Sequence, residues 1–425
     1  MITGLVIIVV GMLIPIPGYA ETLDDAWEAA LAADHSLRAA HWQTESAEQN
    51  LDAARSQRLP SLTVDGGYHA KNNPSSVDIS DLGLPVNQFP ADEKQSLSYG
   101  TNVSLPLYTS GKISHVVDAA NHGLEAEKLN EAGATQDLKM RVAEAYIAVL
   151  RMRRAHTTAE SHRVSLEAHA RDTENLFKQG LADKNALLSA RVEQADAQQQ
   201  VLQAKNDVDI AGAAYNRLLG RELSLAVDPE ELKPTGPKSD LPDLTRRALL
   251  QRPAVLALSH QAEALRKQAA AERAGRGPQA KLSGGYNFDE NRFQVNEGVW
   301  SVNLGVQWEL FDGGAKNHRS SAIARQADAL METRDDLQSK IELEVREAWL
   351  ELHESKERTE VTRQAVGQAD ENLKVARNLF KAGMATHTQV LDAERLRTTT
   401  YTNHDNATYD HVLAGLRLRR TLGEL

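Results

Sequence analysis

The chain has no cysteine among its 425 residues. This absence excludes a disulfide framework, a thiolate zinc site, a cysteine nucleophile and the lipid anchor that some exported bacterial proteins carry on a cysteine. Aromatic residues are also scarce, at 5%, whereas Ala, Gln, Glu, Arg and Leu fill long stretches. Such a composition argues against several globular cores, although length alone suggests two or three domains.

Basic residues are fewer than acidic ones, with 48 Lys and Arg against 59 Asp and Glu. No stretch clusters Lys and Arg as phosphate contacts require, so we expect no nucleic-acid partner. The sequence also lacks the HExxH, P-loop, G-x-S-x-G and G-x-G-x-x-G motifs. His162 and His169 share a helical face, where a solvated or a packing role is simpler than metal binding. We therefore expect no enzyme activity, no bound metal and no other cofactor.

An apolar run near the N-terminus, Leu5–Ile16, precedes small residues at Gly18 and Ala20. This pattern fits a secretory signal and its cleavage site, and the run is shorter than the ~20 residues of a membrane-spanning helix. The first three residues supply no Lys or Arg, which leaves the translation start open. We expect residues 1–20 to be removed on export. No later stretch reaches 18 consecutive apolar residues.

The sequence repeats itself. A shift of 203 residues places Leu107–Gly111 on Leu310–Gly314 and Asn175–Lys178 on Asn378–Lys381 without an insertion, while upstream the shift is 218. The difference falls in the stretch 71–94, which is polar and contains three prolines, so we expect a long loop there. A fixed period of this kind predicts an internal two-fold repeat.

Each copy is expected to hold the same elements in the same order. Proline is absent between 107 and 228 and again after 278, so both stretches are free to be helical, since a proline inside a helix costs about 3 kcal/mol. A helix from 113 to 177 would extend on the order of 95 Å. Gly180 and Gly383 divide the two helical stretches, as glycines at helix C-termini do.

The first copy is expected at 21–230, with a helix at about 23–58, strands at 61–70 and 97–107, and helices at 113–177 and 181–219. The second copy is expected at 231–425. It would hold a helix at about 241–274, strands at 279–288 and 299–310, and helices at 317–380 and 384–422.

The predicted strands alternate between apolar and polar residues. Leu62, Val64 and Tyr68 are interleaved with Thr63 and Asp65. The alternation continues in two further strands, through Leu97, Tyr99, Thr101, Val103, Leu105 and Leu107 and through Trp300, Val302, Leu304, Val306, Trp308 and Leu310. A soluble sandwich shows the same period of two. These strands, however, approach the 9 to 11 or so residues of membrane strands, and Trp and Tyr gather at their ends. We therefore predict a sheet that crosses a membrane.

A sheet in lipid must close into a barrel, because no water is present to satisfy its edge amides. Four strands cannot close alone, since even about eight leave an interior barely wide enough for side chains. Copies of the chain must therefore pool their strands. Two copies would give eight strands and three would give twelve, and this geometry does not choose between them.

With these features the chain resembles the TolC family of bacterial outer-membrane efflux and secretion ducts, over essentially its whole length after the signal. The blocks that carry the resemblance are Leu310–Gly314, Asn378–Gly383, Val390–Ala393 and Leu422–Gly423. The resemblance implies a mixed α and β fold. In it, a homotrimeric twelve-stranded transmembrane β-barrel, with four strands per protomer, continues into a long periplasmic α-helical coiled-coil barrel. The missing cysteine places the chain with the non-lipidated members.

The resemblance also implies site residues. The helix turns would dock a periplasmic adaptor of an inner-membrane transporter, and a gate would follow the second turn. There, Gln389 and Asp392 stand where some members have two aspartates, so only one acidic ring would remain, and Ala385 stands where one member has a latching arginine. The adaptor-docking tips would be Gly180, Leu181, Ala182, Asp183, Gly383, Met384, Ala385 and Thr386, and the junction between barrel and tunnel would be Gly111, Asp312, Gly313 and Gly314.

The function that we predict is the outer-membrane channel-tunnel of a tripartite efflux system, a passive duct embedded in outer-membrane lipid and opened by docking of the adaptor and pump. One alternative is the outer-membrane duct of type I protein secretion. Another, from a different class, is a periplasmic coiled-coil scaffold whose strands form a soluble cap.

Overall fold

The computed structural model describes residues 20–78, 80, 88–234, 236 and 239–425. Apart from Ala20, the expected signal lies outside the described residues. The chain divides into two compact units. Unit 1 comprises residues 1–38, 133–252 and 340–425, and unit 2 comprises residues 39–132 and 253–339. Each unit is described by itself below.

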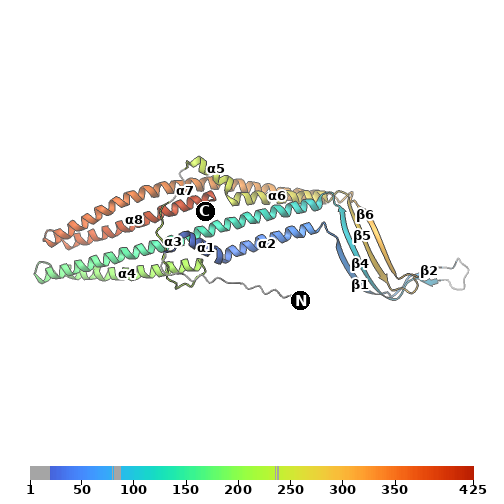
Figure 1. Ribbon diagram of the computed structural model, residues 1–425, viewed down its shortest axis with the longest axis horizontal. Coiled ribbons are helices and arrows are strands. Elements are labelled where there is room, and N and C mark those ends of the chain that lie inside the picture. Colours follow the sequence, from blue (N-terminus) through green and yellow to red (C-terminus); the bar gives the residue numbers. More distant parts are fainter. Residues whose placement is uncertain (1–19, 79, 81–87, 235, 237–238) are drawn as a thin grey trace, which may run out of the picture. The chain divides into compact units, whose positions relative to one another are not determined.

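Unit 2 contains a four-stranded antiparallel sheet with the order β1-β4-β5-β6 (Figure 1). Its strands are β1 (Ser61–Ala70), β4 (Gln95–Tyr108), β5 (Gln279–Asp289) and β6 (Gly298–Gln307). The strand expected to reach residue 310 thus ends at Gln307. Gly285 is required in the middle of β5, because a Cβ atom there would collide with the carbonyl oxygen of Thr101 on β4.

The register of the sheet gathers the apolar residues of all four strands on one face. Leu62 pairs with Val103, which pairs with Gly284, which pairs with Val302. Along the next row, Tyr286 pairs with Trp300. These apolar side chains are exposed, Val64 at 74% and Trp300 at 75%. The period of two seen in the sequence therefore yields one exposed apolar face and one polar face.

The stretch 71–94 is not only a loop. It holds a short antiparallel pair formed by β2 (Ser76–Asp78) and β3 (Gln88–Pro90). The expectation of an irregular polar loop was wrong for these two segments. A three-residue pair can form within a polar stretch because its hydrogen bonds join backbone groups and require no apolar face.

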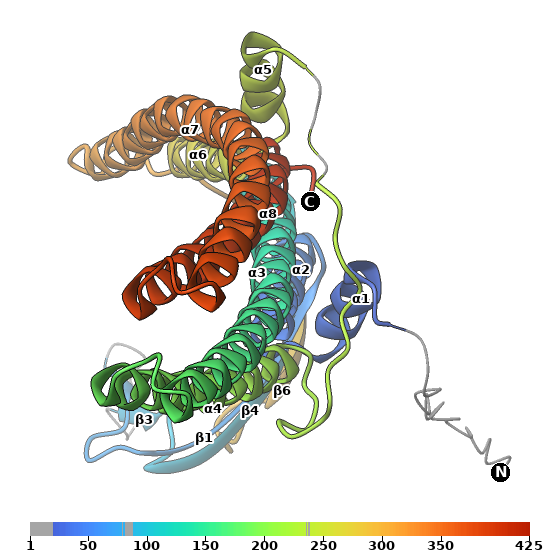
Figure 2. The same ribbon diagram turned by 90° about the vertical axis from the view of Figure 1, so that its left-hand side faces the viewer.

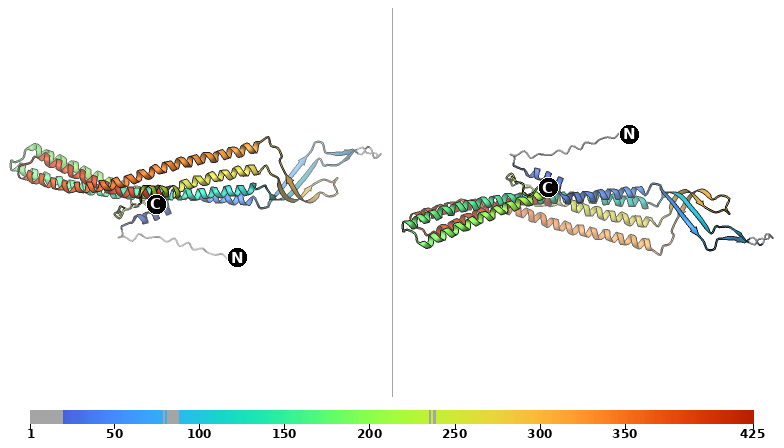
Figure 3. Two further views of the ribbon diagram at one scale, coloured as in Figure 1. Left: turned by 90° about the horizontal axis from the view of Figure 1, so that it is seen from above. Right: turned by 90° about the horizontal axis from the view of Figure 1, so that it is seen from below.

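Unit 1 is built from helices. It contains α1 (Leu23–Ala33), α4 (Lys184–Leu218), α5 (Leu241–Gln251) and α8 (His387–Leu422), together with the later parts of α3 (Lys112–Lys178) and α7 (Ala315–Lys381). The helices α3 and α4 form one hairpin, and α7 and α8 form a second (Figure 2). The turns of both hairpins lie at the same end of the unit (Figure 3). Helices α2 (His35–Ser56) and α6 (Pro253–Ala274) lie mainly in unit 2.

The core of unit 1 forms around two tyrosines with no exposed surface, Tyr146 of α3 and Tyr215 of α4. Their rings meet edge to face at 5.9 Å. The Tyr146 hydroxyl lies 2.7 Å from the carbonyl oxygen of Glu21 and 2.8 Å from that of Glu230. The buried Tyr146 hydroxyl therefore holds two other segments of the chain, at Glu21 and at Glu230, against α3.

Two helices expected to be continuous are broken. The segment 23–58 divides at Asp34, whose extended backbone ends α1 and whose carboxylate accepts a hydrogen bond from the Leu37 amide at the start of α2. The segment 241–274 divides before Pro253, because a proline disfavours helical backbone at the preceding residue. Among the described helices, none combines the length and the apolar character needed to cross a membrane.

Candidate functional site

The first hairpin of unit 1 turns at Gly180. This residue has a φ of +75°, a conformation that glycine adopts without strain. The Leu181 amide donates to the carbonyl oxygen of Leu176 at 2.9 Å, and Asp183 caps α4 by accepting from the Ala186 amide at 2.6 Å. The Leu181 side chain is 72% exposed. The turn thus presents one apolar side chain between a glycine cap and an acidic cap.

The second hairpin turns in the same way at Gly383, with a φ of +73°. The Met384 amide donates to the carbonyl oxygen of Leu379 at 2.8 Å. Thr386 and Gln389 form a reciprocal capping box at the start of α8, in which the Gln389 side chain accepts from the Thr386 amide at 2.8 Å. Met384 is exposed to the same extent as Leu181.

The two residues predicted to form the gate lie beside this turn. Gln389 and Asp392 border a cleft of about 370 Å³ between α7 and α8, together with Met384 and Ala385. Asp392 is exposed, whereas the Gln389 carboxamide is engaged in the helix cap. The structure therefore gives Gln389 a local structural role that the analysis of the sequence missed. The Thr-x-x-Gln spacing was the available signal for it.

The residues predicted to join strands and helices lie in two tight turns of unit 2. Gly111, Gly313 and Gly314 all have positive φ, at +87°, +67° and +86°. The Asp312 carboxylate accepts hydrogen bonds from the backbone amides of Lys316 and Gly314, at 3.0 and 2.9 Å, and these bonds hold its pKa below the ordinary value. Asp312 thus caps the start of α7.

A buried polar cluster below the second turn was not predicted from the sequence. Glu394 of α8 is only 1% exposed and pairs with Arg377 of α7 at 2.5 Å. Ser165 of α3 hydrogen bonds to both of these side chains. One oxygen of the Glu394 carboxylate has no hydrogen-bond partner among the described residues. The cluster ties the second hairpin to the first through charged groups that are costly to bury.

Two histidines lie between this cluster and the turn. His169 of α3 faces His387 of α8, with 2.8 Å between Nε2 and Nδ1, and it also contacts the ring of Phe380. Burial lowers the pKa of His169 to about 4 and lowers the pKa of His387 as well. Of the solvated and packing roles left open for His162 and His169, the structure shows packing, since both side chains are buried. The His162 side chain is buried and hydrogen bonds to Thr398 at 3.0 Å.

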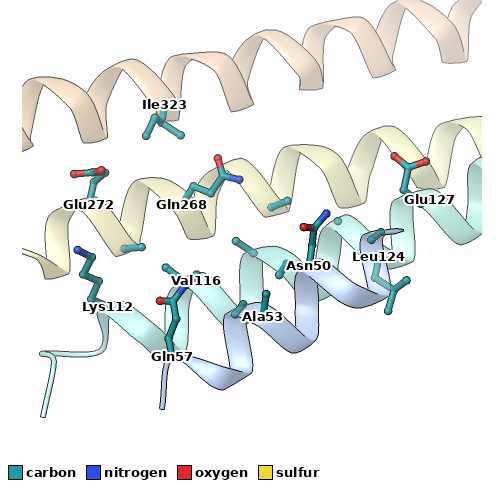
Figure 4. A pocket seen from close by; sticks show the side chains of 17 residues that line it. Asn50, Ala53, Gln57, Lys112, Val116, Leu124, Glu127, Gln268, Glu272 and Ile323 are labelled. Carbon is teal, nitrogen blue, oxygen red and sulfur yellow. The ribbon is translucent and has the colours of Figure 1, made fainter. Parts of the chain in front are cut away.

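A larger cavity, of about 660 Å³, lies within unit 2 (Figure 4). Its walls come from α2, α3, α6 and α7, and alanine is the most frequent lining residue, at seven of seventeen. The charged side chains of Lys112, Glu127 and Glu272 and the amides of Gln57 and Gln268 also border it. In the part of the chain that the structure describes, no three His, Asp or Glu side chains are grouped as metal ligands.

Comparisons with known proteins were made for the whole chain. A family model described as outer membrane efflux protein matches residues 26–221 and 244–424. The chain is 25% identical to the outer membrane protein TolC of Vibrio cholerae, and the alignment covers 96% of this chain and 92% of that protein. It is 24% identical to the alkaline protease secretion protein AprF of Pseudomonas aeruginosa, with 96% and 85% covered.

Solved structures agree with these sequence matches. The outer membrane protein VceC of Vibrio cholerae superposes with a TM-score of 0.79 at 19% identity, over 94% of this chain and 96% of that one. At so low an identity the likeness shows a shared fold. The mixed, predominantly helical architecture described above is therefore shared with this outer membrane protein.

Proposed function

This chain belongs to the outer membrane efflux protein family and is a TolC-family outer-membrane channel, and from this premise we propose that it is the passive exit duct of a tripartite efflux system. The duct performs no reaction. Its energy comes from an inner-membrane transporter, and its helical part extends through the periplasm toward a periplasmic adaptor. Docking of the adaptor shifts the helix hairpins from a closed to an open arrangement.

The observation that carries the proposal is the sheet with one apolar face and two open edges. Within the described residues β1 pairs only with β4, and β6 pairs only with β5. The exposed apolar face suits lipid, but the edge amides of β1 and β6 would have no partner in lipid. Pairing β1 of one copy with β6 of the next satisfies both edges.

We infer that three copies assemble, because twelve strands leave a lumen wide enough for a conduit whereas eight do not. The 203-residue shift in the sequence supports an origin of each protomer by duplication. The element order is consistent with this origin, since α1, α2, β1, β4, α3 and α4 are followed by α5, α6, β5, β6, α7 and α8.

The turns at Gly180 and Gly383 are proposed as the docking tips, and Asp392 as the charged residue of the gate. Leu181 and Met384 support the first role, because an exposed apolar side chain at a rigid turn is a suitable anchor for a partner. The Asp392 carboxylate borders the cleft next to the second tip and is free of the helix cap that engages Gln389.

The test of the duct is its assembly state and conductance. The full chain should be recovered from outer membranes, elute in detergent with three times the mass of one chain, and conduct ions in planar bilayers. A monomer that stays soluble without detergent, recovered from the periplasmic fraction, would instead support the coiled-coil scaffold and refute the duct.

A second candidate is the duct of type I protein secretion. It is favoured by the match to AprF, which is named for alkaline protease secretion and is aligned over 96% of this chain. A deletion strain separates the two. Increased sensitivity to small toxic compounds with normal protein export supports efflux, and loss of an exported protein with unchanged sensitivity supports secretion.

A further inference from the structure

The contact between His169 and His387 can hold only one proton between its two facing nitrogens. His169 Nε2 and His387 Nδ1 are 2.8 Å apart, and the two ring planes lie within 13° of each other. At this distance one nitrogen must donate its hydrogen and the other must accept it with a bare lone pair. If both rings were charged, two hydrogens would face each other. The contact therefore exists only when at least one ring is neutral.

Burial of the pair opposes the second charge. His169 is 4% exposed and lies against the ring of Phe380, and His387 Nε2 is buried without a hydrogen-bond partner among the described residues. The charged groups that face the pair come from every neighbouring element. Asp172 on α3, Asp183 in the first turn and Glu193 on α4 favour charged rings, whereas Arg377 on α7 opposes them. Burial outweighs the carboxylates, since the pKa values of both histidines are lowered. Lys381 on α7 pairs with Asp172 at 3.1 Å.

The contact also spans the two hairpins of unit 1. His169 belongs to the first hairpin, whereas His387 is the first residue of α8 and lies two positions before Gln389 and five before Asp392. The position of His387 therefore fixes the start of the helix that carries the proposed gate. Losing the contact would release this helix start from α3.

We propose that His169 and His387 form a latch that holds the second hairpin against the first at neutral pH and is released by acid. The proposal rests on the proposed function, because it assigns a control to the gate of that duct.

The direction of the pH effect follows from the lowered pKa values. The pKa of His169 is about 4 in the latched arrangement, against about 6.5 for a solvated histidine. The latched arrangement thus binds fewer protons than the released one. It is fully favoured above about pH 6.5, and it loses on the order of tenfold in its ratio to the released form per pH unit below that value, until about pH 4.

A distance measurement tests the latch without relying on transport. Because the chain has no cysteine, Leu181→Cys and Met384→Cys introduce the only two labelling sites per chain for nitroxide spin labels. In the detergent-solubilised protein, the distance between the two labels of one chain should be short and narrowly distributed at about pH 7.5. At about pH 5 this distance should be longer and more broadly distributed. An unchanged distribution overturns the proposal.

Two variants attribute the change to the histidines. His169→Asn combined with His387→Gln keeps hydrogen-bonding side chains without titrating, and this variant should lose the acid response. The single variant His387→Gln should reduce it and serves if the double variant does not fold. The matched control is His122→Gln, which removes another contact of α3 with a histidine, His260 at 3.2 Å in unit 2. This control should keep the full response. A full response in both variants of the latch overturns the proposal.

Bilayer recordings separate this proposal from the proposed function. A wild-type conductance that rises at acid pH, and that no longer rises in the His387→Gln variant, supports both. If the spin-label response is present and no variant conducts at any pH, the latch stands and the duct is refuted. If all variants conduct with the same pH dependence and the distances do not change, the duct stands and the latch is refuted.

Discussion

The two hairpins of unit 1 end in turns of the same construction, but the side chains beneath the two turns differ in burial. Phe177 and Phe380 occupy equivalent positions under the 203-residue shift, yet Phe177 is 39% exposed and Phe380 only 8%. An ion pair lies beneath each of these residues at equivalent positions, but the acidic and the basic residue have exchanged places. Glu174 and Arg191 are paired at the surface of the first hairpin, whereas in the second hairpin Arg377, 37% exposed, pairs with a Glu394 side chain that is only 1% exposed. Turns of the same construction thus lie above an exposed ion pair in the first hairpin and above an ion pair with a buried carboxylate in the second.

This difference determines how firmly each turn is held. Surface ion pairs contribute little and rearrange readily, whereas a buried carboxylate held by Arg377 and Ser165 keeps its surroundings in one arrangement. The first hairpin can act as a compliant support. The second hairpin, which carries Gln389 and Asp392, is fixed by groups that tolerate few alternatives, so a change in its charge state has a structural consequence.

Among the variants that test this difference between the hairpins, Phe380→Ala is expected to have the largest effect on local stability. Phe380 packs with Leu373, Val390 and Leu176, and its removal leaves a cavity, so local stability should fall by about 3 to 5 kcal/mol. Hydrogen exchange of the α7 and α8 amides near the turn measures this loss. The equivalent Phe177→Ala should leave the exchange of the first hairpin nearly unchanged. Equal losses in both hairpins would contradict the asymmetry.

A second variant removes the buried pair from one side. Arg377→Met leaves the Glu394 carboxylate without its cation, and protection near the second turn should fall by about 3 kcal/mol. Adding Glu394→Met should restore much of it, because two apolar side chains need no counter-charge. The matched control, Arg191→Met in the first hairpin, should have no measurable effect. A double variant as unstable as Arg377→Met would show that packing, and not charge, dominates.

The sequence predicted the turns well because their determinants are local. The glycines that end the helices, Gly180 and Gly383, were predicted in this way. The capping residues before the next helices, Asp183 and Thr386, are equally local signals but were not recognised. The break before Pro253 was equally readable, and only the assumption of one continuous helix obscured it. In the strands, a strict period of two predicted the shared apolar face without any knowledge of the register.

The buried cluster could not be predicted in the same way. Ser165 and Glu394 are 229 positions apart in the chain and meet only because the two hairpins pack together. Nothing in the local sequence separates Glu394 from Asp392, the exposed acid two positions before it on α8. The 203-residue repeat even misleads here, since it aligns Glu394 with the exposed Arg191. Only the packing of the hairpins decides which of two equivalent ion pairs becomes buried.

A third prediction concerns the proposed gate. Asp392→Ala should raise single-channel conductance or weaken block by divalent cations in planar bilayers, because carboxylates gathered near a symmetry axis attract cations. The companion variant Ser189→Asp places a carboxylate at the equivalent position of the first hairpin and should leave both properties as in the wild type. If Asp392→Ala changes neither conductance nor block, Asp392 is a solvated acid and not part of a gate.

The smallest expected change in stability separates the two roles of Gln389. A glutamate at this position keeps the hydrogen bond to the Thr386 amide and adds a negative charge near the start of α8, so Gln389→Glu should stabilise the turn by about 0.3 to 1 kcal/mol. It also adds a carboxylate one helical turn before Asp392, so cation block should become stronger. In the first hairpin, Ala186→Glu should bring the stabilisation without the block. If Gln389→Glu stabilises the turn and leaves cation block unchanged, Gln389 serves the helix cap alone, and the second hairpin owes its gate to Asp392 and to the buried contacts beneath it.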